Sequence, residues 1–187
     1  MRVDLTLQVD AKNTEEITSR QSISAFGHLG THIDLMGKSF SLDKFSRRGR
    51  LIDVSSVTER DIEVGDFKGV EIEEMDFALI YTGFTDRVSY GSHAYFKTHP
   101  ALSMEAIEFL LQKKVSLIGI DAAGLMRGED HPEVDRVCVE HNVFVVENLV
   151  NLKALSCVPI ETNITVYTLA VNIEGLTGVP CRVIAEF

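Results

Sequence analysis

Two histidines and one aspartate lie close together in residues 27–34, which read GHLGTHID. Imidazole nitrogens and carboxylate oxygens are ligands that zinc- and manganese-class cations accept, and three protein ligands leave coordination positions open for water or substrate. The types and spacing of His28, His32 and Asp34 therefore indicate a candidate metal site. Histidines four residues apart also occur on solvated surfaces and in hydrogen-bonded cores, so their spacing alone leaves both interpretations open.

The local conformation decides whether these three side chains can meet. In a helix, His28 and His32 would share a face, but Asp34 would lie off that face. The two glycines and Thr31 also disfavour a helix. In an extended segment, His32 and Asp34 point to the same side because side chains alternate, and a turn at Gly30 can bring His28 to that side. We therefore predict a turn that runs into a strand.

Other apolar runs predict the elements that must hold this segment. The expected strands cover residues 2–9, 51–54, 77–82, 115–120, 143–146, 164–173 and 181–185. Two helices are expected, at residues 104–114 after the N-cap candidate Ser103 and at residues 132–141 from Pro132. Residues 10–21 and 83–97 are expected to be loops. Strands in runs and in strand–helix–strand units predict an α/β protein with a mixed sheet or barrel packed against a few helices.

Length and composition limit the class of protein. The chain has 187 residues, which predicts one domain over residues 1–187. The net charge of −10 disfavours nucleic acid as a partner. A basic segment, residues 47–50, is either a solvated loop or a binding edge for an anionic substrate or a neighbouring subunit. Neither a signal peptide nor an apolar run of membrane-spanning length is evident, so we expect a cytoplasmic protein without a membrane partner.

The histidine segment resembles the H-x-G-T-H-x-D signature of the cyclase family. This family of metal-dependent hydrolases includes bacterial kynurenine formamidase and isatin hydrolase. Further similar stretches follow in the same order: HPALS at residues 99–103, IGID at 118–121 and VVENLVNL at 145–152. The resemblance implies a swivelling β/β/α fold, a divalent metal such as zinc or manganese, and a small-molecule substrate. It also implies assembly as a homodimer or homotetramer.

The same resemblance implies a set of metal ligands. His28, His32 and Asp34 would be joined by Glu147, which closes an apolar run and, by its position alone, is either a strand-end charge or a buried ligand. The family pattern has a further histidine twelve residues before that glutamate, where this chain has Asp135. A carboxylate there can still bind a metal and hardens the site toward manganese, magnesium or zinc.

Helix geometry, independently of the family, adds His131 to the candidates. It lies four residues before Asp135, so the two side chains share a face if the helix extends back one turn. His131 then supplies the imidazole that position 135 lacks. The alternative is an exposed histidine at the start of the helix. Asp121, which ends an apolar strand, is a candidate to hydrogen-bond a ligand histidine.

A second departure from the family concerns the proton-transferring group. The family pattern continues with a proline and a histidine at the positions of Met36 and Lys38. Lysine titrates near pH 10.4, so Lys38 acts as a base at neutral pH only if burial or a nearby cation lowers its pKa. Lys38 is our catalytic candidate, either for proton transfer or for binding an anionic substrate group.

These observations support two functional hypotheses. The first is a metal-dependent hydrolase of an amide, cyclic amide or similar small acyl substrate, acting on carbon–nitrogen bonds other than peptide bonds. The second is a divergent, non-catalytic member that binds a metal or ligand, because Lys38 and Asp135 alter the base and one ligand.

Overall fold

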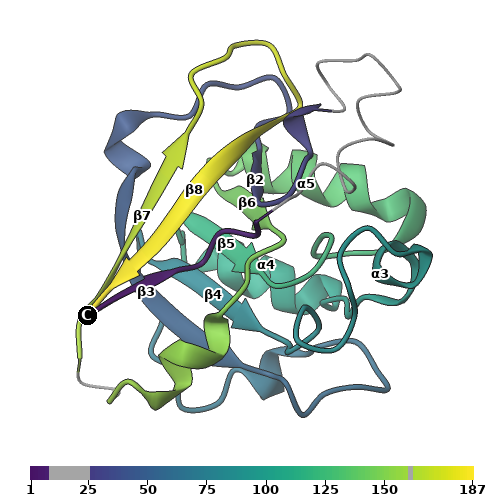
Figure 1. Ribbon diagram of the computed structural model, residues 1–187, viewed down its shortest axis with the longest axis vertical. Helices are drawn as coiled ribbons and strands as arrows, with labels where there is room; N and C mark the ends of the chain where they lie inside the picture. Colours follow the sequence, from purple (N-terminus) through teal and green to yellow (C-terminus); the bar gives the residue numbers. More distant parts are fainter. Residues whose placement is uncertain (9–25, 160–161) are drawn as a thin grey trace.

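A closed barrel of mixed strands organises the chain (Figure 1). The computed structural model describes residues 1–8, 26–159 and 162–187, and in this part of the chain eight strands form one sheet. They are β1 (Arg2–Asp4), β2 (His32–Asp34), β3 (Ser46–Asp53), β4 (Phe77–Tyr81), β5 (Leu117–Ile120), β6 (Phe144–Glu147), β7 (Ile164–Ala170) and β8 (Gly178–Glu186). Their order is β1-β8-β2-β6-β5-β4-β3-β7, and an additional β7–β8 pairing closes a ring of seven strands. The predicted α/β fold with a barrel is confirmed.

Strand direction divides the barrel into two parts. Strands β3, β4, β5 and β6 run parallel to one another, whereas every pairing that involves β1, β2, β7 or β8 is antiparallel. Parallel neighbours need a crossover connection, and α5 (His131–Glu140) connects β5 to β6 in this way. The N-terminus of such a helix lies at the carboxyl ends of the strands. The first residues of α5 are therefore near the last residue of β6.

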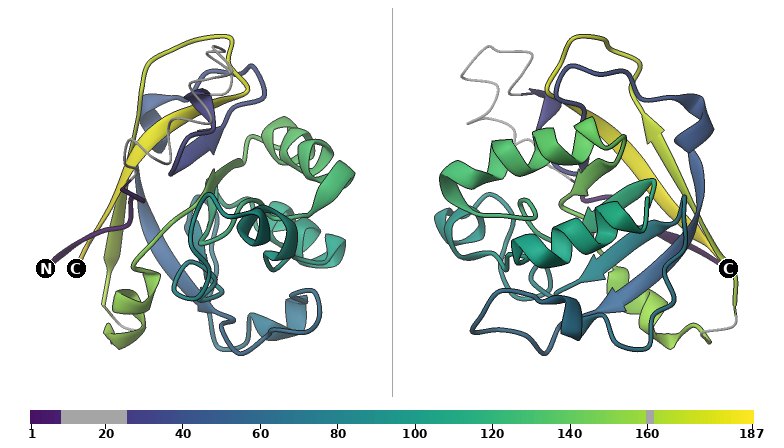
Figure 2. Two further views of the ribbon diagram at one scale, coloured as in Figure 1. Left: turned by 45° about the vertical axis from the view of Figure 1, so that its right-hand side comes forward. Right: turned by 180° about the vertical axis from the view of Figure 1, so that it is seen from behind.

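Helices cover one side of the barrel. These are α3 (His93–Thr98), α4 (Met104–Gln112) and α5, and α4 and α5 lie side by side in Figure 2. The Ser103 hydroxyl accepts a hydrogen bond from the amide of Ala106, so the predicted N-cap of α4 is confirmed. The remaining helical segments of the described ranges are the 3₁₀ turns η1 (Leu42–Lys44), η2 (Val64–Asp66), η3 (Gly128–Asp130) and η4 (Leu152–Cys157).

Two hydrophobic cores lie on opposite faces of the barrel wall. One is built mainly from strands around the ring and includes Ile33 of β2 and Val146 of β6. The other joins the outer face of the parallel strands to α4 and α5 and includes Val145. Because successive side chains on a strand point to opposite faces, His32, Asp34 and Glu147 lie on the helix side of the wall.

The basic segment is not a loop, and that interpretation is wrong. Residues 47–50 belong to β3, which begins five residues before the predicted strand. Arg48 donates to both carboxylate oxygens of the buried Asp76, at 2.8 and 3.0 Å. Nε of Arg47 donates to the Ser116 hydroxyl at 3.0 Å. The positive charges are thus used to attach β3 to the edge where β4 and β5 begin.

Several other boundaries differ from the prediction. The expected loop at residues 83–97 contains most of α3, whose N-terminus is capped by Ser92. β7 ends at Ala170 and β8 begins at Gly178, both earlier than expected. The first strand is limited to Arg2–Asp4, and the predicted loop at residues 10–21 lies outside the described residues.

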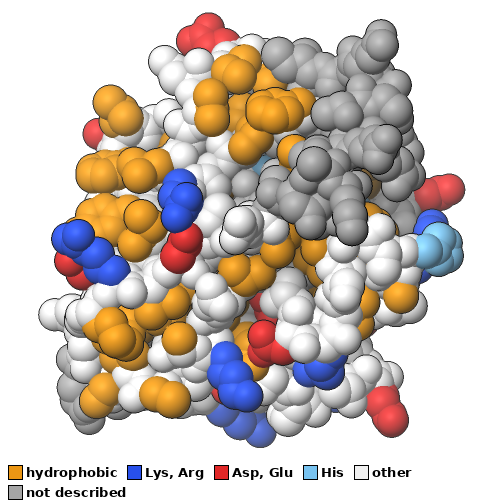
Figure 3. Space-filling view, viewed as in Figure 1, with side chains coloured by type: hydrophobic (Ala, Val, Ile, Leu, Met, Phe, Trp, Pro, Cys, Tyr) orange, Lys and Arg blue, Asp and Glu red, His pale blue; other side chains and the backbone are white. Residues whose placement is uncertain are grey.

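An apolar surface lies around η1 and the end of β7. Hydrophobic side chains gather on the left of Figure 3, over β7 and its neighbours. The exposed hydrophobic side chains around η1 and the end of β7 are those of Leu42, Phe45, Leu169 and Val171. They line or adjoin a groove of 260 Å³ between η1 and the end of β7. Within the described ranges, no helix is long and apolar enough to cross a membrane. The homodimer or homotetramer and the cytoplasmic location stay predictions.

Candidate metal centre

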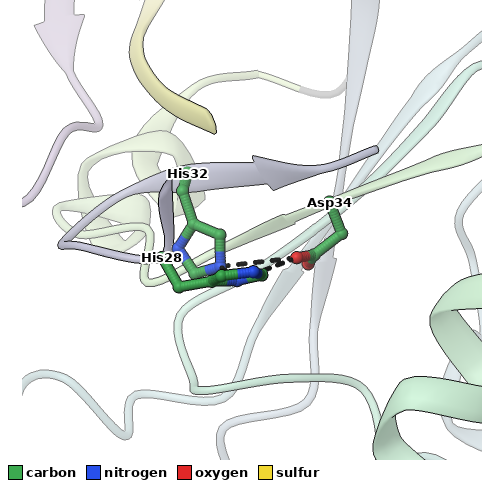
Figure 4. Close-up of side chains that lie close together, drawn as sticks. All are labelled: His28, His32 and Asp34. Carbon is green, nitrogen blue, oxygen red and sulfur yellow. Dashed lines mark hydrogen bonds and ion pairs between the residues drawn. The ribbon is translucent and has the colours of Figure 1, made fainter. Parts of the chain in front are cut away.

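The three residues of the N-terminal motif converge as the predicted turn and strand require (Figure 4). Gly30 has φ +63°, in the left-handed region that glycine favours, and β2 begins two residues later. Nδ1 of His28 lies 3.0 Å from Nε2 of His32 and 3.3 Å from Oδ1 of Asp34. Nε2 of His32 lies 3.5 Å from the same aspartate oxygen. The proposed turn at Gly30 is confirmed.

Glu147 completes this group from the neighbouring strand. His32 and Glu147 are direct partners in the antiparallel pairing of β2 with β6. Side chains of such a pair stand on the same face of the sheet. Nε2 of His32 lies 3.5 Å from Oε2 of Glu147, which is 4% exposed. Of the two interpretations of Glu147, the solvated strand-end charge is therefore wrong.

His131 and Asp135 approach Glu147 from α5. The helix begins at His131, so the two side chains share a face, as helix geometry predicted. Nε2 of His131 lies 2.8 Å from Oε1 of Glu147 and 3.1 Å from Oδ2 of Asp135. The His131 side chain is 28% exposed. The interpretation of His131 as an exposed histidine is thus wrong, and the structure brings all six histidine and carboxylate candidates together.

Hydrogen bonds orient the two histidines of the motif. Nδ1 of His32 lies 2.9 Å from the carbonyl oxygen of Gly30. When Nδ1 carries the proton and donates to this carbonyl, Nε2 of the neutral imidazole keeps a lone pair that can bind a metal. Nε2 of His28 lies 2.9 Å from the hydroxyl of Thr177, so Nδ1 faces the cluster. Each imidazole is therefore held through one nitrogen and presents the other to the carboxylates.

Asn148 holds the turn that carries His28, and sequence reasoning did not identify it. Its side-chain amide donates to the carbonyl of Gly30 at 2.9 Å. Its amide oxygen accepts from the hydroxyl of Tyr95 at 2.7 Å, and its backbone carbonyl accepts from the hydroxyl of Thr31 at 2.7 Å. The available signal was its place directly after Glu147 in the VVENLVNL stretch.

Burial and charge set the protonation of the cluster. Burial disfavours the imidazolium of His32, but the carboxylates of Asp34 and Glu147 outweigh it and raise its pKa to about 9. Burial also lowers the pKa of His131, but its hydrogen bonds with Asp135 and Glu147 outweigh this effect and raise the pKa to about 11. Burial raises the pKa of Asp135 to about 7, supported by the charges of Asp34 and Glu147.

The residues present fit a divalent cation. Asp34, Asp135 and Glu147 are all at most 4% exposed, and three adjacent buried carboxylates are unfavourable without positive charge. In the metal-free protein, protons on His32 and His131 supply that charge. Oδ2 of Asp34 and Oδ1 of Asp135 are buried and have no hydrogen-bond partner among the described residues. A cation would satisfy both oxygens and replace the protons.

Lys38 and Asp121 lie outside this arrangement. Nζ of Lys38 donates at 2.8 Å to the carbonyl of Val139, near the C-terminal end of α5. Among the described residues, no hydrogen bond or ion pair joins Lys38 to the cluster, so its catalytic role stays a prediction. The Asp121 carboxylate accepts bonds from Thr82 and Phe84 rather than from a histidine, which overturns that expectation.

The fold and the site together define the class of protein. It is a closed barrel of mixed strands that carries a candidate metal centre of buried imidazoles and carboxylates. The family model Cyclase, described as "Putative cyclase", matches residues 3–125, which is more than half of the 187 residues. The chain belongs to this family. The matched region includes β2 and the whole GHLGTHID motif.

Individual proteins match this chain at low sequence identity, between 20% and 30%. An uncharacterized protein of Methanocaldococcus jannaschii is 30% identical over 95 residues, which cover 50% of this chain and 47% of that protein, so the match spans about half of its length. A solved structure described as a potential metal-dependent hydrolase with cyclase activity has a TM-score of 0.73 at 22% identity, covering 99% of this chain and 96% of the other. Isatin hydrolase A from Ralstonia solanacearum has a TM-score of 0.75 at 20% identity, with 99% and 91% covered. At such identities, the structural matches show a shared fold.

Proposed function

We propose that the protein is a metal-dependent hydrolase of an amide, cyclic amide or similar small acyl substrate, acting on carbon–nitrogen bonds other than peptide bonds. The observation that carries the proposal is the convergence of His28, His32, Asp34 and Glu147, with the buried, unpartnered Oδ2 of Asp34 in their midst. Asp135 is the proposed further ligand. Similarity to a potential metal-dependent hydrolase and to isatin hydrolase supports the assignment.

The donor set favours zinc or manganese. It combines imidazole nitrogens, which suit zinc, with carboxylate oxygens, which suit manganese and magnesium. A divalent ion bound there would lower the pKa of a coordinated water and polarise the substrate carbonyl. The side chain of His28 is 39% exposed, whereas those of His32 and Asp34 are at most 3% exposed. Water and substrate therefore reach the cluster from the His28 side.

Lys38 is proposed to bind an anionic group of the substrate. The ammonium group of Lys38 donates to the carbonyl of Val139, which lies one helical turn after Asp135. The ammonium group therefore lies along the face of α5 that carries Asp135. A lysine near a cation retains its own charge more readily than it becomes a base. Proton transfer by Lys38 is the competing role, and substitution by arginine separates the two roles because arginine keeps the charge but does not deprotonate.

A second candidate function is a non-catalytic protein that binds a metal or ligand. The observation in its favour is that Lys38, at the position of the family's proton-transferring histidine, uses its ammonium group to bind the Val139 carbonyl. In this case the ligands would remain while the group that transfers protons has been lost.

Metal content and a substrate panel test the proposal. Protein purified without chelator should contain zinc or manganese in stoichiometric amount, and His28→Ala or His32→Ala should lower this content. The exposed His93 of α3 lies outside the cluster, so His93→Ala is the matched control. Metal-loaded protein should hydrolyse at least one of a panel of formyl-amines, cyclic imides, isatin-like lactams and lactones.

The outcomes separate the hypotheses. Protein that binds no divalent ion after reconstitution would refute the metal-dependent function. Undiminished activity of His28→Ala would do the same. If the parent is inactive on the whole panel but Lys38→His is active, the non-catalytic function is the correct one.

A further inference from the structure

We propose that a pocket lined by Arg60, Arg87 and Arg127 binds a small molecule through a phosphate monoester group. The pocket has a volume of 350 Å³. Small-molecule sites have volumes of about 300–1,000 Å³, so this one suits a small ligand. No histidine or carboxylate of the candidate metal centre is among the described residues that line it. The pocket is therefore a separate site, and its ligand is independent of the proposed metal dependence.

The three arginines lie in the loops that follow three neighbouring parallel strands. Asp53, the last residue of β3, pairs with Tyr81, the last residue of β4. Ile120, which ends β5, pairs with Ile80 of β4, so the three carboxyl ends are level. Each following loop supplies one of the arginines, six or seven residues after its strand ends. In proteins built on parallel strands, ligands bind at the carboxyl ends of the strands, where these loops meet.

Arg87 contributes a guanidinium group that forms no ion pair within the described ranges. Its Nη2 donates to the carbonyl of Thr82 at 3.2 Å. Gly83 leaves room for this side chain, because a β-carbon at position 83 would lie 2.8 Å from Nη1 of Arg87. The guanidinium group is thus placed against the end of β4, and its other N–H groups can bind an anion.

Arg60 and Arg127 are held in position by aspartates. Nη1 and Nη2 of Arg60 donate to the two carboxylate oxygens of Asp66, both at 2.7 Å. Arg127 donates from Nη2 to Asp61 and from Nη1 to the carbonyl of His99, both at 2.7 Å. Nε of each arginine donates to no group among the described residues. Because the side chains are already ordered, a ligand that binds their remaining N–H groups loses less free energy to ordering.

The lining of the pocket favours a phosphate monoester over a carboxylate. A phosphate monoester offers three acceptor oxygens and a charge of about −1.5 to −2 at pH 7, so it can accept from three guanidinium groups. A carboxylate offers fewer oxygens and less charge. The hydroxyl groups of Thr58 and Thr98 add further donors, whereas Phe84 and Val88 give the pocket an apolar part. The apolar part suits the organic portion of the ester.

Glu59 opposes an anion in this pocket. Its side chain is exposed and lines the pocket beside the arginines. The chain as a whole carries a net charge of −10, so its general field does not attract phosphate. Binding must therefore come from direct contact with the guanidinium groups. Removal of the Glu59 charge should strengthen it.

Calorimetric titration tests the site. Glycerol 3-phosphate is titrated into the purified protein, with inorganic phosphate and succinate as comparison probes, and the monoester should bind more tightly than succinate. Arg87→Ala should weaken monoester binding at least about 10-fold, because hydrogen bonds to charged groups are stronger than those between neutral groups. Arg87→Lys keeps the charge but loses the paired N–H groups, so it should recover part of the affinity.

A variant with the opposite expected effect and a control make the test specific. Glu59→Gln should strengthen monoester binding, and a misfolded protein would not give such a gain. Arg182→Ala removes an exposed arginine of β8 that lies outside the pocket, and it should leave the affinity unchanged. The titrations are repeated after treatment with a chelator, because a bound metal ion would also bind phosphate. Circular dichroism of each variant establishes that it is folded.

The outcomes are distinct. Absence of monoester binding in the wild type would overturn the site, as would equal affinities of the wild type and Arg87→Ala. Monoester binding that disappears after chelator treatment would overturn it as well. Weaker binding by Glu59→Gln would contradict the location, and tighter binding of succinate than of the monoester would overturn the assignment to phosphate. Metal content is measured separately, so each of these results leaves the proposed hydrolase function to its own test.

Discussion

A β-carbon on Gly178 would lie 2.6 Å from Cε1 of His28, so the imidazole occupies the space that a side chain at position 178 would fill. Gly178 is also the strand partner of Asp34 in the pairing of β2 with β8. The preceding residue, Thr177, contacts Nε2 of His28. The start of the last strand therefore shapes the candidate metal centre to which the N-terminal motif contributes three side chains.

Substitution Gly178→Ala should weaken metal binding without unfolding the protein. The added methyl group must displace the His28 ring, and we expect the affinity for zinc to fall at least about 10-fold, the scale on which supporting residues act. Isothermal titration calorimetry measures the change. Gly65→Ala is the control, because a β-carbon at position 65 would have no neighbouring atom within 4 Å. An unchanged affinity in Gly178→Ala would show that His28 is not a ligand.

Metal binding should release protons and strengthen as pH rises. In the metal-free protein, the pKa values of His32 and His131 are raised to about 9 and about 11, so both imidazoles are protonated at pH 7. Ligand imidazoles must be neutral, and the apparent affinity should rise about tenfold per pH unit for each proton released. Titrations at pH 7 in buffers of different ionisation enthalpy count the protons. Equal heats in all buffers would contradict the prediction.

The metal-free protein should lose stability at alkaline pH. Both histidines have folded pKa values above the unfolded value of about 6.5, so the stabilisation is fully present below that pH. It is lost as pH rises through about 9 for His32 and about 11 for His131. Urea midpoints at pH 7 and pH 10 measure the effect, and His32→Gln should reduce the difference. A midpoint that rises between these pH values would contradict this sign.

Asp121→Ala should destabilise the fold strongly. The buried carboxylate accepts from the amide and hydroxyl of Thr82 at 2.7 Å and from the amide of Phe84 at 3.1 Å. Removing it leaves buried donors without partners, and the free energy of unfolding should fall by about 2–4 kcal/mol. Urea unfolding measures the change. Glu108→Ala, on the exposed face of α4, should shift it by less than about 0.5 kcal/mol.

Lys38 variants should separate a substrate-binding role from proton transfer. If Lys38 anchors an anionic group, Lys38→Arg keeps most of the activity, whereas Lys38→Met loses it with unchanged metal content. If Lys38 transfers a proton, both variants lose turnover. The kinetic constants kcat and KM of each variant, together with metal analysis, distinguish these cases. Full activity of Lys38→Met would exclude both roles. The remaining role of Lys38 would then be its hydrogen bond to the Val139 carbonyl.

Local sequence patterns predicted the part of the site that depends on neighbouring residues. The alternation of a strand places His32 and Asp34 on one side, and Gly30 permits the turn that returns His28. Helical spacing likewise brings His131 onto the face of Asp135. These relationships follow from backbone geometry over a few residues, so they can be derived without knowing the fold.

Tertiary structure alone decided how the motif residues His28, His32 and Asp34 meet Glu147 and the residues of α5. The register of β2 on β6 places His32 opposite Glu147, and the spaces at Gly124 and Gly178 admit the rings of His131 and His28. Strand register and the fit of a ring against a distant glycine depend on how segments far apart in the chain pair and pack. A one-residue change of register would turn each strand's side chains to the opposite face. The sequence by itself therefore determined which side chains could bind a metal, and the closure of the barrel decided that they face one another.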